Sequence, residues 1–316
     1  MKHKLVYAFL VCALTALLSG APAFAASLGT ATRSVIPTDV QQIINVDYRR
    51  MKGSDTAMAM KAKLMPQNMK QFEDALKSIG VDPDRDLEQI TLASFRTKGN
   101  GLQIIGVAQG QFPRKKLGLR LTKQKISGKK INGSAVYPMA GGMQMTFLDD
   151  WTMLFGDGAA VQAALDARDG SSMSLNANSD VTDMIASVDQ GTIWSVLDAS
   201  GTQTMLKSAL GTAADLAEFE TFKKHLTGSR YTVDFDHGVD FNLSVTTSDN
   251  MAASTLSSLV KAGLLFKKVS ASPVEKNAIE ATTVDSDAGR LVVHFKADDK
   301  SFQSLLDAPM FAAVTR

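Results

Sequence analysis

Hydrophobic and polar residues alternate most regularly between Arg230 and Val245. Every second residue is apolar from Tyr231 to Phe235, and the same alternation resumes from Val239 to Val245. A period of two predicts a β-strand with one buried and one solvent-facing side. The intervening His237-Gly238 pair is typical of a tight turn. This segment is therefore expected to form a β-hairpin.

Other stretches show the same alternation or a helical spacing. Pairs of strands are expected at Gln89–Phe95 with Leu102–Gln109, and at Ile279–Val284 with Arg290–Ala297. A helix before Gly80 is indicated by apolar residues three or four positions apart, and these are Met65, Met69, Phe72, Leu76 and Ile79. The spacing also predicts a longer helix over about 250–268, and its C-terminal Lys267 and Lys268 suit the negative end of the helix dipole.

The elements repeat in the same order along the chain. In each half of the chain the predicted order is a strand, helices, a hairpin, a helix, strands and a final helix. This repeated order suggests an internal duplication. Clean alternation favours antiparallel sheets with one face under helices and one face exposed to water. The predicted fold class is α+β, with two related two-layer halves at 41–170 and 190–316, and a polar linker at 171–189.

The first 25 residues have the features of a secretory signal peptide. Lys2 and Lys4 precede an apolar run to Leu18, and Ala23-Phe24-Ala25 is a small-x-small cleavage site before Ala26. The expected parts are thus a leader at 1–25 and a lead-in segment at 26–40. The apolar run is too short for a permanent membrane span, so the processed protein is expected not to be transmembrane. Because the leader is secretory, the processed protein is expected to act in the periplasm or medium.

The chain has a single cysteine, Cys12, which lies inside the leader, so the mature protein is expected to be cysteine-free. That excludes disulfides and thiolate chemistry. The residues before Cys12 fit a lipoprotein signal poorly.

Charge is distributed unevenly although the total is close to neutral. Between Gln89 and Leu148 there are ten basic residues and no acidic residue, whereas the chain after this block is acidic. The block either forms a cationic surface for an anionic ligand or docks on the acidic part. The residues predicted to contact such a ligand are Arg114, Lys115, Lys116, Arg120 and Lys123.

A resemblance covers roughly residues 72–169. The run Gly80–Thr91, the segments Gly106–Gly110 and Ala135–Tyr137, and the run Phe155–Leu165 resemble segments of uncharacterised secreted bacterial proteins. The resemblance implies a secreted α+β protein and no chemistry.

Motifs for catalysis or metal binding are weak throughout. Asp82, Asp84 and Asp86 alternate as in a calcium loop but lack the later glycine and glutamate, so a capped turn is the preferred interpretation. No Gly-x-Ser-x-Gly motif occurs, although Ser195, Asp198 and His294 could in principle assemble a triad. No catalytic residue, metal ligand or cofactor is predicted, and a near-neutral secreted chain is a poor nucleic-acid binder.

The leading functional hypothesis is a non-catalytic secreted or periplasmic binding protein for an anionic amphiphile such as a phospholipid, or for an envelope polymer. An apolar groove between sheet and helices would hold the apolar part. The alternatives are a structural or protein–protein interaction module, which includes self-association, and an unrecognised envelope hydrolase.

Overall fold

Twelve antiparallel strands form one continuous sheet in the computed structural model of the chain. The structure describes residues 28–65, 67–97, 101–210 and 217–308. The predicted leader, residues 1–25, lies outside the described residues. The sheet order is β11-β12-β10-β9-β8-β1-β2-β3-β7-β6-β5-β4.

The strands occupy the following ranges: β1 Val40–Asp47, β2 Leu87–Thr97, β3 Gly101–Gly110, β4 Lys129–Ile131, β5 Ser134–Pro138, β6 Gln144–Phe147, β7 Thr152–Gly156, β8 Ile193–Asp198, β9 Leu226–Asp234, β10 Val239–Thr247, β11 Thr282–Asp287 and β12 Arg290–Ala297. The α-helices are α2 Thr30–Val35, α3 Tyr48–Lys52, α4 Asp55–Leu64, α5 Gln67–Ser78, α6 Pro83–Asp86, α7 Arg114–Lys123, α8 Gly158–Arg168, α9 Ser179–Ala186, α10 Ala199–Leu210, α11 Ala217–Phe222, α12 Asn250–Ser270, α13 Pro273–Glu280 and α14 Asp299–Leu306.

The two halves of the chain share this sheet and have the same strand order. Strands β1-β2-β3-β7-β6 run outward in one direction, and β8-β9-β10-β12-β11 run outward in the other. The halves meet where β1 pairs with β8, for example at Ile44 and Ser195. The repeated order agrees with the duplication inferred from the sequence.

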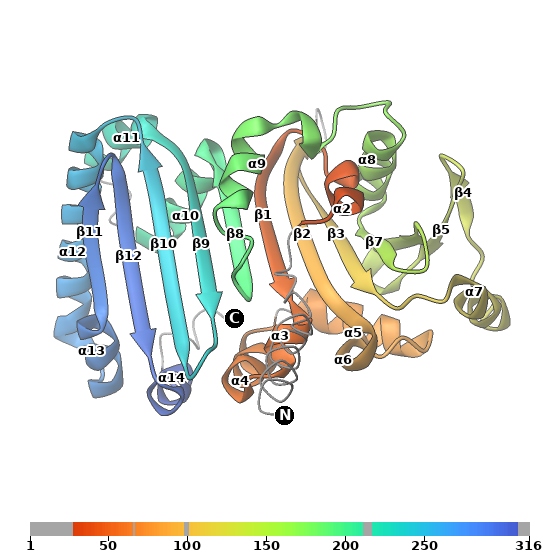
Figure 1. Cartoon of the computed structure of the whole chain (residues 1–316), viewed down its shortest axis with the longest axis horizontal. Coiled ribbons are helices and arrows are strands. Elements are labelled where there is room, and N and C mark those ends of the chain that lie inside the picture. The colour runs from red at the N-terminus through yellow and green to blue at the C-terminus, as the bar shows by residue number, and fades with distance from the viewer. Residues whose placement is uncertain (1–27, 66, 98–100, 211–216, 309–316) are drawn as a thin grey trace, which may run out of the picture.

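The predicted α+β class with an antiparallel sheet is confirmed. In the C-terminal half, β9 and β10 form the predicted hairpin, with His237 and Gly238 at positive φ in its turn. One face of this half packs under α10 to α14, and the other face carries polar residues such as Arg230, Asn242 and His294. Figure 1 shows β9 to β12 with this polar face uncovered.

The N-terminal half has an additional layer compared with the predicted two-layer arrangement. Helices α2, α8 and α9 cover one face of its strands, around Ile43 and Trp194. On the opposite face, α5 and α7 pack on Ile90 and Phe155. This half is buried on both faces because β2 and β3 carry apolar residues on both sides, such as Ile90 and Ala93 on β2 and Val107 and Ala108 on β3.

The segment predicted as a polar linker, 171–189, contains a short 3-10 helix at Leu175–Ala177 and the helix α9. Leu175, Val181 and Ile185 are buried in the same core as β1 and β8. The segment therefore contributes to the core at the junction of the halves.

A buried polar network joins α3, α4 and α5 beside the sheet. The Tyr48 hydroxyl donates to Glu73 Oε1 at 3.1 Å, and Lys61 Nζ lies 2.8 Å from the same oxygen. Lys61 also pairs with Asp84 at 3.1 Å and lies over the Tyr48 ring. Burial, then the charge of Glu73 and the hydrogen bond to it, raise the pKa of Tyr48 well above its ordinary range.

This shift predicts a loss of stability at alkaline pH. Below pH about 10 the tyrosine is protonated in both states, but above it the unfolded phenol ionises while the folded Tyr48 keeps its proton. Unfolding therefore becomes more favourable as pH rises, by up to about 1.4 kcal/mol per pH unit from this group. Urea unfolding between about pH 9 and 11 should show a shallower decline in Tyr48→Phe than in the wild type. Equal slopes in the two proteins would contradict the prediction.

Candidate functional site

An apolar cavity of about 470 Å³ lies in the C-terminal half, between the sheet and helices α12, α13 and α14. Its floor is formed by side chains from β9, β10 and β12, and Met60 of α4 also lines it. The lining residues are Met60, Val233, Val239, Phe241, Leu264, Lys267, Glu275, Ala278, Ile279, Thr282, Val293, Phe295, Phe302 and Leu305. This volume is within the range of small-molecule sites.

The cavity lies between two separate hydrophobic core clusters. One cluster lies under α12, where Leu264 and Val293 pack at its border. The other joins α4 and α14, where Val233 and Phe295 pack at its border. These border residues are only half-buried.

On the corresponding face of the N-terminal half, a hollow of about 400 Å³ has Phe72, Leu92 and Phe155 in its lining. There Phe72 of α5 stacks on Phe155 of β7, with ring centroids 3.8 Å apart. Gly106 opposite Phe155 leaves room for the ring, since a Cβ at this position would lie 2.1 Å from it. The order of strands is the same in both halves and each half has a hollow on this face, but the lining of the one in the C-terminal half is more apolar.

A second, more polar hollow of about 510 Å³ adjoins the cavity. The two share Ala278, Phe295 and Leu305 in their linings. The polar hollow also includes Lys296 of β12, Lys300 of α14 and Asn277 of α13. Lys296 is paired with Asp240 in the register of β10 and β12, and its Nζ lies 3.7 Å from Asp240 Oδ2, so its ammonium lies on the uncovered polar face of the sheet.

The acidic groups around these two spaces are already engaged. Glu275 Oε2 accepts from the Ser272 backbone N–H at 2.8 Å, which completes the capping box of α13. Asp298 accepts from the backbone N–H of Ser301 at 2.8 Å and from its hydroxyl at 3.1 Å. The two hydrogen bonds, that from the backbone first, lower the pKa of Asp298 below its ordinary range, so it stays charged as the N-cap of α14.

Exposed apolar side chains project from the last turns of α12, close to the cavity. Phe266 and Val269 are each 83% exposed and Leu265 is 66% exposed, while the neighbouring Leu264 and Lys267 line the cavity. Apolar side chains gathered in this way on a water-facing helix are typical of surfaces that meet an apolar partner.

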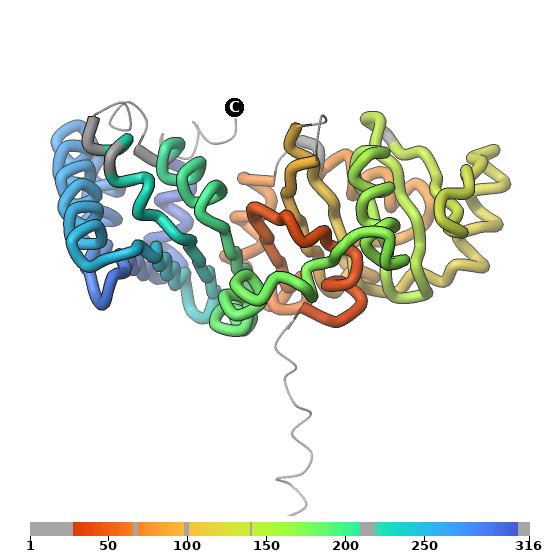
Figure 2. The backbone as a smooth tube through the Cα atoms, turned by 90° about the horizontal axis from the view of Figure 1, so that it is seen from above, coloured from red at the N-terminus to blue at the C-terminus, as the bar shows by residue number. Residues whose placement is uncertain are grey.

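The five basic residues predicted from sequence all belong to α7, at the opposite end of the sheet from α12 (Figure 1, Figure 2). Arg114 Nε lies 3.1 Å from Asp150 Oδ1, and its guanidinium also donates to the Leu148 carbonyl at 3.2 Å. Arg120 donates to the Ile79 carbonyl at 3.1 Å. Both arginines thus connect α7 to its neighbours, whereas Lys115, Lys116 and Lys123 are exposed.

The ligand role of these five residues stays a prediction. The structure brings them together on one helix, but it does not place them beside the apolar cavity. A smaller hollow of about 320 Å³ under α7 includes Arg114 in its lining and none of the other four.

The residues of the possible hydrolytic triad do not converge. The register from β8 to β12 places Ser195 on the helix-covered face and His294 on the polar face. Ser195 receives a hydrogen bond from Gln42 at 3.3 Å, His294 Nε2 lies 3.1 Å from Asp240, and Asp198 accepts from the Gly201 backbone N–H at 2.6 Å. Residues of opposite parity on aligned strands face opposite sides of a sheet, so these side chains cannot meet.

The carboxylates of the 82–86 segment are likewise engaged in local contacts. Asp82 caps α6 by accepting from the Asp84 backbone N–H at 3.2 Å, and Asp86 pairs with Arg85. Within the described ranges, no three histidine, aspartate or glutamate side chains gather into a group that could hold a metal ion.

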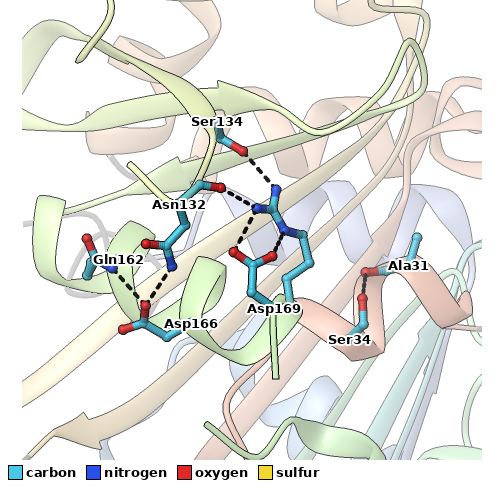
Figure 3. Close-up of polar contacts among 8 residues, drawn as sticks. Ala31, Ser34, Asn132, Ser134, Gln162, Asp166 and Asp169 are labelled. Atoms are coloured by element: carbon cyan, nitrogen blue, oxygen red, sulfur yellow. Dashed lines mark hydrogen bonds and ion pairs between the residues drawn. The ribbon is translucent and has the colours of Figure 1, made fainter. Parts of the chain in front are cut away.

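A dense polar cluster at α8 fixes the β4–β5 hairpin (Figure 3). Arg168 donates to Asp169, to Ser134 Oγ at 2.8 Å and to the Asn132 carbonyl at 3.0 Å. Asp166 accepts from Asn132 and Gln162 at 2.7 and 2.8 Å. Because the donors and acceptors satisfy one another, the cluster is structural.

Sequence reasoning anticipated an apolar groove between sheet and helices but not its residues. Val293 and Phe295 showed the alternation of a half-buried strand, and this pattern is the same over a packed core as over a cavity. Lys296 and Lys300 lie in the acidic part of the chain, where the net charge of the segment concealed them.

Comparison with known proteins gives a fold relationship only. No family model matches the chain, and no curated protein matches it significantly. Crystal form I of TP0453 aligns with a TM-score of 0.54 and 10% identity, covering 90% of this chain and 98% of that one. Crystal form IV of TP0453 gives 0.46 and 9% identity, covering 87% and 96%. The first alignment shows a shared α+β fold, and the resemblance proposed for residues 72–169 stays a prediction.

No helix among the described residues has the length and hydropathy needed to cross a bilayer.

Proposed function

We propose that this protein is a non-catalytic binding protein of the periplasm or medium, and that it carries an anionic amphiphile in the C-terminal half. The observation that carries the proposal is the apolar cavity of about 470 Å³ between the sheet and α12 to α14. A cavity with this lining is unfavourable to hydrate and gains free energy when it receives an apolar chain, by about 0.8 kcal/mol per buried methylene.

Cations at the margin of the cavity support the anionic character of the ligand. Lys267 lines the cavity, and Lys300, which also interacts electrostatically with Asp298, lines the adjoining polar hollow. The secretory leader predicted at residues 1–25 supports a location outside the cytoplasm.

Native mass spectrometry tests this proposal directly. The protein is expressed with its leader, purified without detergent, and weighed under native and denaturing conditions. A native mass excess that matches an amphiphile and disappears on denaturation is the expected result. A protein that arrives empty and also fails to retain added myristate would overturn the proposal.

A protein–protein interaction module is the second candidate, favoured by the exposed Leu265, Phe266 and Val269 of α12. It predicts a concentration-dependent dimer or a co-purifying partner, which light scattering after size-exclusion chromatography would detect. Substituting Phe266 and Val269 with serine should then shift the mass to that of the monomer.

A further inference from the structure

We propose that the α7 end of the molecule docks on an anionic lipid surface, with the lysines of α7 and β4 facing the headgroups. This contact is separate from the apolar cavity and goes beyond the proposed function, because it concerns where the protein is held and not what it carries. It lies at the opposite end of the sheet from α12 (Figure 1, Figure 2). The residues of this docking surface are Lys115, Lys116, Leu119, Lys123, Lys125 and Lys130.

Charge at this end of the molecule is strongly of one sign. Residues 113–138 contain eight arginines and lysines and no acidic residue. Of the acids on neighbouring segments, Asp149 and Asp150 lie in the turn between β6 and β7, and Asp166 lies on α8. Eight cations against these three acids leave this end positive, and a positive end is attracted to an anionic surface. The acidic C-terminal half is too distant to cover it, since the sheet separates the two.

The exposed side of α7 places lysines on both sides of a leucine. Leu117 and Leu121 are buried in the core under α7, whereas Leu119 between them is 67% exposed. The three lysines of α7 are three or four residues from Leu119, so they share its face of the helix, and all three are exposed. An exposed apolar side chain flanked by ammonium groups is typical of a helix that lies in the interface of a membrane.

Two further lysines extend the positive surface beyond the helix. Lys125 follows the C-cap of α7, and Lys130 lies on β4, the last strand of the sheet. Lys130 pairs with Ala135 of β5, which lies on the same side of that strand as Tyr137, and Tyr137 packs in the core under α7. Lys130 is therefore on the α7 side of the sheet, whereas the adjacent Lys129 is on the other side.

The lysines of α7 differ from its arginines in how far other groups engage them. Arg114 is bound to Asp150, and its hydrogen bonds are the main cause that lowers the pKa of that carboxyl, with a smaller contribution from the charge of Lys115. Lys116 and Lys123 are exposed and belong to no ion pair among the described residues. The arginines thus hold the helix on the protein, while the lysines remain for headgroups within a Debye length of the bilayer.

Apolar side chains favour a lipid surface over an acidic polymer or protein as the partner. Besides Leu119, Trp151 is 59% exposed and directly follows Asp150, the residue that pairs with Arg114 at the start of α7. Tryptophan is enriched at the headgroup level of membranes, because its ring is apolar and its N–H is polar. A polyanion in water needs the lysines and gains nothing from Leu119, so this leucine separates the two partners.

Co-sedimentation with vesicles tests the proposal, using vesicles of phosphatidylcholine alone or mixed with phosphatidylglycerol. The first variant is the triple Lys115→Gln, Lys116→Gln and Lys123→Gln, and the second is Leu119→Ser. The matched control removes the same charge from the C-terminal half. It is the triple Lys207→Gln, Lys224→Gln and Lys276→Gln, all three of which are exposed. Far-ultraviolet circular dichroism and thermal unfolding confirm that each variant is folded.

We expect the wild type to bind the phosphatidylglycerol vesicles and not the neutral ones, and to bind less as salt is added. The α7 triple variant should bind about tenfold more weakly or worse, and Leu119→Ser about fivefold more weakly, with the control triple equal to the wild type. Equal binding to both kinds of vesicle, no binding to either, or an equal loss in the two triple variants overturns the proposal. If Leu119→Ser binds the vesicles as the wild type does, while the α7 triple loses binding to the soluble polyanion heparin, the partner is an anionic polymer and the lipid assignment is wrong.

Discussion

Replacing Val293 with tryptophan is expected to weaken binding of myristate about a hundredfold while leaving the protein folded. Val293 lies on β12 at the floor of the apolar cavity, where it is only half-buried. The larger side chain takes the volume of roughly four methylenes of a bound chain, which corresponds to about 3 kcal/mol, or an affinity about a hundredfold lower. The cavity gives the indole room, so we expect little overpacking strain.

The matched control is Val292→Trp on the same strand. Val292 lies next to Val293 in sequence but on the opposite, polar face, where Ser244 and Asp285 are its partners on the neighbouring strands. This variant should bind myristate as the wild type does. Equal affinities for Val293→Trp and Val292→Trp, both folded by circular dichroism, would show that the cavity is not where the ligand binds.

Replacing Glu73 with leucine is expected to destabilise the fold by about 3–5 kcal/mol, because it removes one partner of a buried ion pair. The side chains of Lys61 and Glu73 are each only 11% exposed, and the Tyr48 hydroxyl depends on the same carboxylate. Without Glu73, the Lys61 ammonium keeps the contact with the exposed Asp84 and its position over the Tyr48 ring, but it loses its buried counter-charge. The free energy of unfolding in urea, measured near pH 7, gives the size of the effect.

A surface pair on the same side of the molecule provides the comparison. Arg49 and Glu88 lie 3.4 Å apart with side chains 51% and 40% exposed, so Glu88→Leu should cost no more than about 1 kcal/mol. If Glu73→Leu lowers the free energy of unfolding as little as Glu88→Leu does, the buried network around Tyr48 does not stabilise the fold as predicted.

Local patterns along the chain were reliable where one face of an element is buried and the other is wet. The β9–β10 hairpin and the helix at 250–270 follow directly from periods of two and 3.6. The 171–189 segment differs, because its polar composition concealed three buried side chains, Leu175, Val181 and Ile185. A short helix with few apolar residues has the composition of a loop, and only its packing against β8 distinguishes the two.

The basic block shows a similar limit for charge. Ten basic residues without an acid left two interpretations open, a cationic surface or docking on the acidic part of the chain, and Arg114 and Arg120 hold α7 against Asp150 and the Ile79 carbonyl. Clustering along the chain reports composition, whereas the availability of a charge depends on the groups that surround it in three dimensions.

The sequence by itself determined the α+β class, the antiparallel pairing, the repeated order of elements and the positions of its clearest strands and helices, since these depend on local periodicity and turn residues. The tertiary structure alone decided that β1 and β8 join the halves into one sheet, and that an apolar cavity remains under α12 in the C-terminal half. It also decided that Lys267 lines that cavity. The reason is physical: alternation specifies which side of a strand is apolar, but the volume left on that side depends on side chains from distant segments.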